Sequence, residues 1–339
     1  NPSTPTKVKC SDFASEHFLL HKNRRWKELT LQQLNYVIKI SETNSFNKAA
    51  EELYISQPSL TVAVKELEKE LGITIFNRSG RGVTLTNDGT EFLLYARQLY
   101  NQYDIIKEKY GEGGNLKKKF GVSTQHYSFA VKAFVEMVKD FDLNEFEFAI
   151  RETKTREVIE DVNTMRSEIG ILYLNDFNRK SMMKLLKSNE LEFHHIIECK
   201  AYVYIWKNHP LANNKIITLE ELDEYPCLSF EQGNTNSFYL SEEILSTNNY
   251  KKTIKANDRA TMLNLMVGLN GFTLCSGIIC EELNGTDYIA VPLDVSESEA
   301  GGNMEIGYII RKNMILSNTG QRYIESIKEY LSNLTKSSE

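Results

Sequence analysis

Residues 46–72 read FNKAAEELYISQPSLTVAVKELEKELG and contain two helical patterns separated by a short break. In the second pattern, Ser56 is a good N-cap, and Pro58 falls in the first turn, where its ring is tolerated. Gly72 is a typical helix end. One apolar stripe follows helical spacing and comprises Leu60, Val64, Leu67 and Leu71. The stretch therefore predicts two helices joined by a tight turn, the second with one buried face.

A further helix precedes this pair, and a β-hairpin follows it. Ser45 is a good N-cap for the helix that carries Phe46. The earlier helix is indicated by Leu31, Leu34, Val37, Ile38 and Ile40. Two β-rich runs over residues 73–86 surround Ser-Gly-Arg-Gly, a hairpin signal. Together these elements predict a winged helix-turn-helix domain over residues 29–86.

The outer face of the third helix suits contact with DNA. A helix fits the major groove, and its N-terminus offers free N–H groups to phosphate. Arginines on the hairpin would contact the DNA backbone or the minor groove, although a solvated hairpin with two surface charges is the alternative. The candidate DNA-binding residues are Ser56, Gln57, Pro58, Ser59, Thr61, Val62 and Lys65 on the helix, with Arg78 and Arg81 on the hairpin.

A long helix is expected from Thr86, its N-cap, to about Lys109. Its apolar residues follow a heptad, which two helices can bury together. The predicted dimer contacts are Phe92, Ala96, Leu99, Tyr103 and Ile106. Packing against the chain's own body is the alternative. Residues 87–116 are therefore interpreted as a linker and dimerisation helix that ends in a glycine-rich hinge.

Residues 117–335 alternate short β-like runs with helical segments, which favours an α/β fold with mainly parallel sheets. Ligands of such folds bind at the carboxyl ends of strands. Each polar residue that follows a predicted strand is by itself typical of a turn or a helix cap. The hypothesis is that several of them come together in one ligand site. The candidate ligand-binding residues are Ser123, Thr124, Gln125, Tyr173, Phe230, Glu231, Gln232, Asp258, Thr261, Cys275 and Ser276.

The sequence of residues 29–89 resembles the N-terminal domain of LysR-type transcriptional regulators, without a gap. The shared motifs are S-F-x-x-A-A, S-Q-P-S-L, L-E-x-x-L-G, an I-F-x-R run and L-T-x-x-G. Val62 departs from the basic or polar residue that is frequent there, so no base preference is carried over. An apolar group could instead meet a thymine methyl.

This resemblance implies a two-lobed effector domain like that of periplasmic binding proteins. Lobe I would comprise residues 117–195 and 300–335, and lobe II residues 196–299, with crossings near 193–198 and 292–303. It further implies a homodimer or homotetramer on an inverted-repeat DNA operator and a small-molecule effector, which would be anionic if it used the donors of Ser123, Thr124 and Gln125. RNA polymerase is a further candidate partner.

Composition narrows the class of protein to which the chain could belong. The chain is 41% hydrophobic and 25% charged, with a net charge of −6, as in soluble globular proteins. No apolar run could span a membrane, and no signal peptide is evident, so a cytoplasmic location is expected. Residues 1–28 are assigned no role. The alternative is a basic arm that contacts phosphate through Arg24, Arg25 and Lys27.

The motifs of catalysis and metal binding are missing from the sequence. No zinc-binding spacing, P-loop or G-x-G-x-x-G occurs, and no cofactor is expected. The five cysteines include no C-x-x-C pair and are interpreted as reduced thiols, with a Cys275–Cys280 redox pair as the alternative. His194 and His195 would point to opposite faces of a strand and are interpreted as structural.

Two other functions compete with that of an effector-responsive regulator. An enzyme on a binding-protein-like scaffold would need a nucleophile–base pair or a metal site, and neither is apparent. A solute-binding protein for transport would need a signal peptide and would not need a helix-turn-helix. The regulator is therefore the predicted function.

Overall fold

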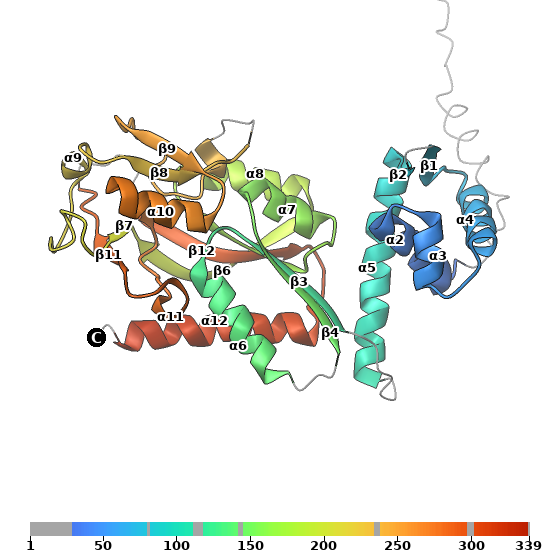
Figure 1. The fold of residues 1–339 in the computed structure, drawn as a ribbon. Coiled ribbons are helices and arrows are strands. Elements are labelled where there is room, and N and C mark those ends of the chain that lie inside the picture. The colour runs from blue at the N-terminus through green and yellow to red at the C-terminus, as the bar shows by residue number, and fades with distance from the viewer. Residues whose placement is uncertain are drawn as a thin grey trace, which may run out of the picture. The chain divides into compact units, whose positions relative to one another are not determined.

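The computed structural model describes residues 29–79, 82–110, 118–141, 145–233, 238–296 and 302–337 (Figure 1). The chain forms two compact units, Asn1–Asp104 and Ile105–Glu339. The predicted N-terminal extension, most of the predicted hinge, and Arg81 lie outside the described residues. No helix in these described ranges is long and apolar enough to cross a membrane.

The first unit consists of a helical trio, a hairpin and the start of a long helix. Its elements are α2 (Leu31–Thr43), α3 (Phe46–Glu52), α4 (Gln57–Leu71), β1 (Phe76–Ser79), β2 (Gly82–Leu85) and α5 (Asn87–Tyr110). The side chains of Ser45, Ser56 and Thr86 accept hydrogen bonds from backbone N–H groups three residues later, which confirms the three predicted caps. Gly72 ends α4 with φ of 72°.

The core of the first unit forms between α2, α3 and α4. Leu60, Val64 and Leu67 of the predicted stripe are buried, whereas Leu71 is half-buried at its edge. The Glu68 carboxylate of α4 accepts hydrogen bonds from the backbone N–H groups of Ile75, at 2.7 Å, and Phe76, at 3.1 Å. These hydrogen bonds attach the start of the hairpin to the helix.

The first turns of α5 belong to this same core. Leu93 and Ala96 are 7% and 1% exposed, and Phe92 is half-buried against them. Ala96 therefore packs inside its own unit and not on a free surface, contrary to the predicted dimer contact. The packing of the unit also extends past residue 86, where the sequence placed a boundary.

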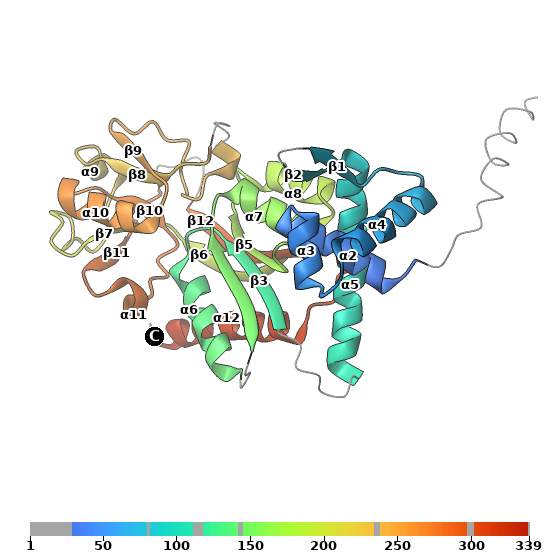
Figure 2. The same cartoon turned by 45° about the vertical axis from the view of Figure 1, so that its right-hand side comes forward.

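The second unit contains a five-stranded sheet with strand order β4-β3-β5-β12-β6 (Figure 2). The strands are β3 (Lys118–Thr124), β4 (Phe146–Glu152), β5 (Ile169–Leu174), β6 (Leu191–Lys200) and β12 (Asn303–Arg311). The helices that pack on it are α6 (Ser128–Asp140), α7 (Thr155–Asn163), α8 (Arg179–Ser188) and α12 (Asn318–Ser337). We call this sheet with its helices lobe I.

Both faces of the five-stranded sheet are covered. In the central strand β5, Ile171 and Tyr173 lie in the cluster that contains residues of α6 and α12. The alternate residues Leu172 and Leu174 lie in a second cluster with residues of α7 and α8. A strand covered on both faces is apolar throughout, which explains the run IGILYL.

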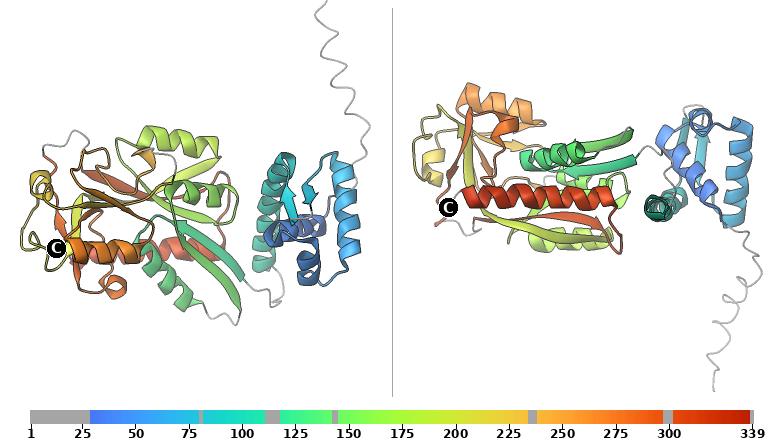
Figure 3. Two further views of the ribbon diagram at one scale, coloured as in Figure 1. Left: turned by 45° about the horizontal axis from the view of Figure 1, so that its top comes forward. Right: turned by 90° about the horizontal axis from the view of Figure 1, so that it is seen from below.

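The chain between β6 and β12 forms a second lobe (Figure 3), which we call lobe II. Its antiparallel sheet has strand order β10-β7-β11, and β8 pairs in parallel with β9. The elements are β7 (Tyr202–Trp206), α9 (Leu219–Leu222), β8 (Cys227–Phe230), η1 (Phe238–Leu240), β9 (Thr253–Ala256), α10 (Arg259–Leu269), β10 (Thr273–Cys275), α11 (Glu281–Asn284) and β11 (Tyr288–Pro292).

Two details of the predicted effector domain are corrected. The sheets are not mainly parallel, because β12 of the five-stranded sheet runs antiparallel to both β5 and β6 and the three-stranded sheet is antiparallel throughout. The predicted first crossing at residues 193–198 lies within β6, which pairs with β12 as far as Lys200, so the chain enters the second sheet at Tyr202. The return, between Pro292 and Asn303, lies where the sequence placed it.

Gly89 offers a test of the close packing between α5 and the hairpin. A Cβ at this position would lie 2.1 Å from the backbone oxygen of Ile75. We expect Gly89→Ala to lower the free energy of unfolding by about 1–3 kcal/mol, because the backbone must shift to relieve the overlap. Chemical denaturation of the full chain measures the change.

Gly268 in α10 is the matched control, since a Cβ there meets nothing within 4 Å. Gly268→Ala should stabilise the chain by up to about 1 kcal/mol, through the better helix propensity of alanine. Equal unfolding free energies for wild type and Gly89→Ala would contradict the described packing.

Candidate functional site

The outer face of α4 carries the predicted DNA contacts in an accessible arrangement. Ser56, Pro58, Ser59, Val62 and Lys65 are exposed. Gln57 and Thr61 are half-buried, and the Gln57 Nε2 donates a hydrogen bond to Thr61 Oγ1 at 2.9 Å. These residues lie away from the buried stripe of the same helix. The sequence therefore placed the two faces of α4 correctly.

The hairpin is attached to α3 by an aromatic contact that sequence reasoning missed. The guanidinium carbon of Arg78 lies 3.9 Å from the centroid of the Phe46 ring. Phe46 in turn meets Phe76 edge to face, with centroids 5.8 Å apart. Arg78 is exposed and pairs with Val83 near the tip of the hairpin, so its charge is held there while the face of the guanidinium contacts the ring.

A cavity of about 90 Å³ lies between the two lobes of the second unit. Lobe I contributes residues from the start of α6, and lobe II contributes α10, β10 and the loop that follows it. Three of the predicted ligand-binding residues line it: Phe230, Cys275 and Ser276. Its apolar wall includes Met262, Met266, Leu274, Ile278 and Met304.

The predicted lobe I residues do not line this cavity, because their side chains are committed to internal hydrogen bonds. Ser123 Oγ donates to Asp161 Oδ2 at 2.6 Å, and Thr124 Oγ1 donates to the carbonyl of Gln125. Gln125 Oε1 accepts from the backbone N–H of Tyr173 at 3.1 Å. All four predicted residues are at most 2% exposed. Any role of theirs in ligand binding would act through their neighbours.

The remaining predicted lobe II residues also lie off the cavity wall. Gln232 Oε1 accepts from the backbone N–H of Thr155, and the N–H of Glu231 donates to the carbonyl of Ala256. Asp258 caps α10, where hydrogen bonds from the backbone N–H and side chain of Thr261 hold the pKa of its carboxyl below the usual range. Both residues of this cap are exposed.

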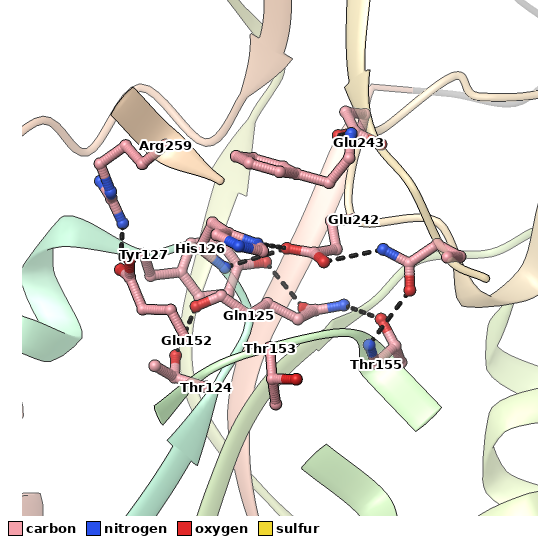
Figure 4. A network of polar contacts seen from close by, with 12 residues as sticks. Thr124, Gln125, His126, Tyr127, Glu152, Thr153, Thr155, Glu242, Glu243 and Arg259 are labelled. Carbon is pink, nitrogen blue, oxygen red and sulfur yellow. Dashed lines mark hydrogen bonds and ion pairs between the residues drawn. The ribbon is translucent and has the colours of Figure 1, made fainter. Parts of the chain in front are cut away.

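Sequence reasoning missed the charged groups that meet between the lobes (Figure 4). His126 and Glu242 form an almost buried pair, with His126 Nδ1 2.8 Å from Glu242 Oε2. Arg259, at the start of α10, pairs with Glu152 at the end of β4. Glu243 Oε1 accepts from the backbone N–H of Phe230 at 2.7 Å. No local motif marks these residues, since their partners are distant in the sequence.

Burial raises the pKa of the Glu243 carboxyl to about 8, and the charge of neighbouring Glu242 adds to the increase. The hydrogen bond from the Phe230 N–H acts in the opposite direction. The carboxyl is thus largely protonated near neutral pH. It can donate as well as accept a hydrogen bond at the cavity wall.

Burial makes the thiols of Cys199 and Cys275 poor nucleophiles. Burial raises the pKa of both Cys199 and Cys275 to about 12. Cys280 is buried between β10 and α11, and its backbone N–H donates to Ser128 Oγ at 3.3 Å. Neutral thiols react slowly with oxidants. The environment of Cys275 disfavours the alternative of a Cys275–Cys280 redox pair.

The two adjacent histidines occupy different surroundings. The His194 ring stacks on Tyr308, with centroids 4.8 Å apart, whereas His195 Nδ1 lies 3.0 Å from Glu305 Oε1. Among the described residues, no group of three or more His, Cys, Asp or Glu side chains could hold a metal ion.

Two family models match the chain. Residues 31–90 match the model for bacterial regulatory helix-turn-helix proteins of the lysR family. Residues 127–332 match the model for the LysR substrate binding domain and make up more than half of the chain. The two matches correspond to the first unit and to most of the second.

Individual relatives cover most of the chain. This chain is 24% identical to the HTH-type transcriptional activator CmpR of Synechocystis sp. over 307 residues. The matched region covers 88% of this chain and 95% of that relative. The chain is 29% identical over 217 residues to the uncharacterized HTH-type transcriptional regulator YvbU of Bacillus subtilis, covering 62% and 69%. A solved full-length OxyR variant from Pseudomonas aeruginosa shares the fold, with a TM-score of 0.62 and 18% identity over 89% of this chain and 95% of that one.

The Glu243 carboxyl should make stability depend on pH. Its pKa is raised in the folded state, so the folded chain binds the proton more tightly than the unfolded chain between about pH 4.5 and pH 8. The contribution of this carboxyl to the free energy of unfolding is therefore fully present below pH 4.5 and is lost as pH rises through 8. We expect unfolding free energy to fall by about 2–3 kcal/mol from pH 6 to pH 9 through this group.

Glu243→Gln should remove this part of the pH dependence, because the amide does not titrate. Denaturant unfolding of wild type and variant at pH 6, 7, 8 and 9 measures it. Parallel curves for the two proteins would show that Glu243 ionises normally in the fold.

Proposed function

Because the chain belongs to the LysR family of DNA-binding transcriptional regulators, we propose that it binds an inverted-repeat operator and that a small-molecule effector between its two lobes modulates this binding. Two copies of α4 would enter successive major grooves. The base-edge contacts would come from Gln57, Ser59, Thr61 and Val62. Ser56, Pro58 and Lys65 would lie against the phosphates at the groove edge.

The observation that carries the proposal is the division of α4 into two faces. Leu60, Val64 and Leu67 are at most 1% exposed and fix the helix to its own unit. The opposite face presents small polar groups and the Val62 side chain, which is 55% exposed. Compact side chains allow the helix backbone to approach base edges closely, and valine can contact a thymine methyl.

The wing supplies the second part of the DNA interface. Arg78 is exposed near the tip of the wing and the Phe46 ring supports it, so the guanidinium would reach phosphate from a fixed position. Arg81 remains a candidate for the wing tip. Both arginines would add affinity that does not depend on sequence.

The cavity between the lobes is the proposed effector site. Its wall comes from both lobes, so a ligand there contacts groups that move apart when the lobes open. Such a ligand has different affinities for the open and closed arrangements and can shift their populations. Ligand binding would affect DNA binding if the open and closed arrangements of the lobes favour different distances between the α4 helices of the oligomer.

The relatives of this chain are named as transcriptional regulators, which favours a regulator over an enzyme.

A dimer is proposed because α5 retains an exposed apolar stripe beyond the core of the first unit. Leu99 and Ile106 are 53% and 58% exposed, and Tyr95 and Tyr103 extend the stripe on the same side of the helix. A cytoplasmic location and an interaction with RNA polymerase belong to the same proposal.

Lys65 tests the role of α4. We expect Lys65→Ala to weaken binding to all DNA sequences and to reduce the slope of log K against log salt by about 0.9 for each phosphate that the lysine neutralises. The binding constant is measured by fluorescence anisotropy at several salt concentrations, with the region upstream of the gene as probe. Lys107→Ala, an exposed lysine near the far end of α5, is the matched control and should keep the wild-type slope.

An unchanged slope for Lys65→Ala would remove this residue from the DNA interface. Binding of the wild type that is no tighter than to random DNA, for all upstream probes, would argue against the regulator function itself.

The α5 stripe predicts the oligomeric state. Leu99→Glu combined with Ile106→Glu should dissociate the dimer, because two charges cannot be buried without partners in an apolar helix interface. Analytical ultracentrifugation should then report a monomer of 39.0 kDa in place of the dimer. Gln98→Glu adds a charge on an adjoining face of the same helix as a control, and a dimer that survives the double substitution would place the interface elsewhere.

A further inference from the structure

A carboxylate of lobe II occupies hydrogen-bond donors of lobe I. Glu242 follows η1 in lobe II, and its Oε2 accepts a hydrogen bond from the backbone N–H of His126 at 2.9 Å (Figure 4). The same oxygen lies 2.8 Å from His126 Nδ1. Its Oε1 accepts from Gln232 Nε2 at 2.7 Å. The side chains of His126 and Glu242 are only 6% and 4% exposed.

The donors around this carboxylate are fixed in place by other interactions. The His126 ring stacks on Phe230, with centroids 3.7 Å apart and an angle of 6° between the planes. Gln232 Oε1 accepts from the backbone N–H of Thr155, which orients its amide toward Glu242. A backbone N–H, an imidazole and an amide thus converge on one negative group, which is an arrangement suited to a carboxylate.

The chain on either side of Glu242 is also attached to lobe I. Thr155 Oγ1 donates to the carbonyl of Leu240 at 2.7 Å, and Tyr173 Oη donates to the carbonyl of Glu243 at 3.0 Å. The Leu240 side chain is 4% exposed and lies in a cluster with residues of α7 and α8. Residues 238–243, which we call the latch segment, therefore pack on lobe I although they lie in the lobe II part of the chain.

The cavity beside this pair contains polar atoms without a normal partner. Thr273 Oγ1 is buried on its wall and makes no hydrogen bond with the described residues. The Tyr204 hydroxyl, whose polar neighbour is Asn284, makes no hydrogen bond of normal geometry either. Buried groups of this kind carry a free-energy cost that a bound ligand can remove. A polar ligand in the cavity could therefore form hydrogen bonds with these two hydroxyls.

We propose that Glu242 is an intramolecular competitor of the effector: its carboxylate holds the donors of His126 and Gln232 until a carboxylate-bearing ligand displaces it and releases the latch segment from lobe I. This inference rests on the proposed effector site and adds its regulation. The exchange leaves the donors of His126 and Gln232 paired both in the ligand-free chain and in the chain with ligand bound. Released Glu242 would free the latch segment to follow lobe II.

Removal of the Glu242 carboxylate should allow a small carboxylate from solution to bind at the vacated position. In the full chain, Glu242→Ala should raise the hydrogen-exchange rate of the His126 amide by about tenfold or more, because its charged acceptor is gone. Sodium acetate at 0.1 M should restore protection and raise Tm by about 3 °C relative to sodium chloride of equal ionic strength. Acetamide, the neutral isostere, should do neither.

Wild type should not respond to acetate beyond the effect of chloride, because its own carboxylate fills the position. Glu160→Ala removes an exposed carboxylate of α7 and is the matched control, with no expected response. A folded Glu242→Ala chain whose His126 amide exchanges as in wild type, or which shows no acetate effect, would overturn the proposal.

Glu242→Gln keeps the size of the side chain and covers the case in which Glu242→Ala fails to fold. Its neutral oxygen accepts a weaker hydrogen bond, so the His126 amide should exchange at least about threefold faster and remain unaffected by acetate. Unchanged exchange in this variant would also overturn the proposal. Operator binding by the same proteins is measured separately, so failure of the regulator function would not be mistaken for failure of the latch.

Discussion

Strand β12 is the constraint on which the two-lobed arrangement depends. It hydrogen bonds to β5 on one edge and to β6 on the other, and its register with β6 begins with Asn303 opposite Lys200. The chain therefore leaves lobe I and returns to it at neighbouring points of one sheet. Any motion between the lobes must bend the backbone at these two adjacent connections. The hydrogen bonds along β12 keep the pivot fixed to the sheet.

The lobes are otherwise joined by a buried apolar cluster, which contains residues of both lobes such as Tyr173 and Leu274, and by individual polar interactions. His126–Glu242, Thr155–Leu240 and Arg259–Glu152 each bridge the two lobes through one or two atoms. Hydrogen bonds to charged groups contribute about 1.5–3 kcal/mol each, and removal of one partner costs about as much. A ligand that replaces a few of these polar interactions can shift the arrangement of the lobes, since differential binding energies are of the same size.

Local signals explain how much of the fold could be predicted from the sequence. The caps at Ser45, Ser56 and Thr86 and the stripe on α4 depend on residues within one or two turns, and the structure has them where they were predicted. The ligand-binding residues depend on interactions between distant parts of the chain, such as His126 and Glu242, which are 116 positions apart. Polar residues after strands could therefore be identified, but their partners could not. Ser123 and Gln125 are instead satisfied within lobe I.

The heptad stripe on α5 shows the same limit, because periodicity reports that a face is buried but not by what. Leu93 and Ala96 complete the core of the first unit, while Leu99 and Ile106 remain exposed. This division decides how the protein can be dissected. A fragment cut at the predicted boundary, Thr86, would lack the side chains that close its own core. A minimal DNA-binding fragment that folds autonomously should instead extend to about Asp104, where the first unit ends.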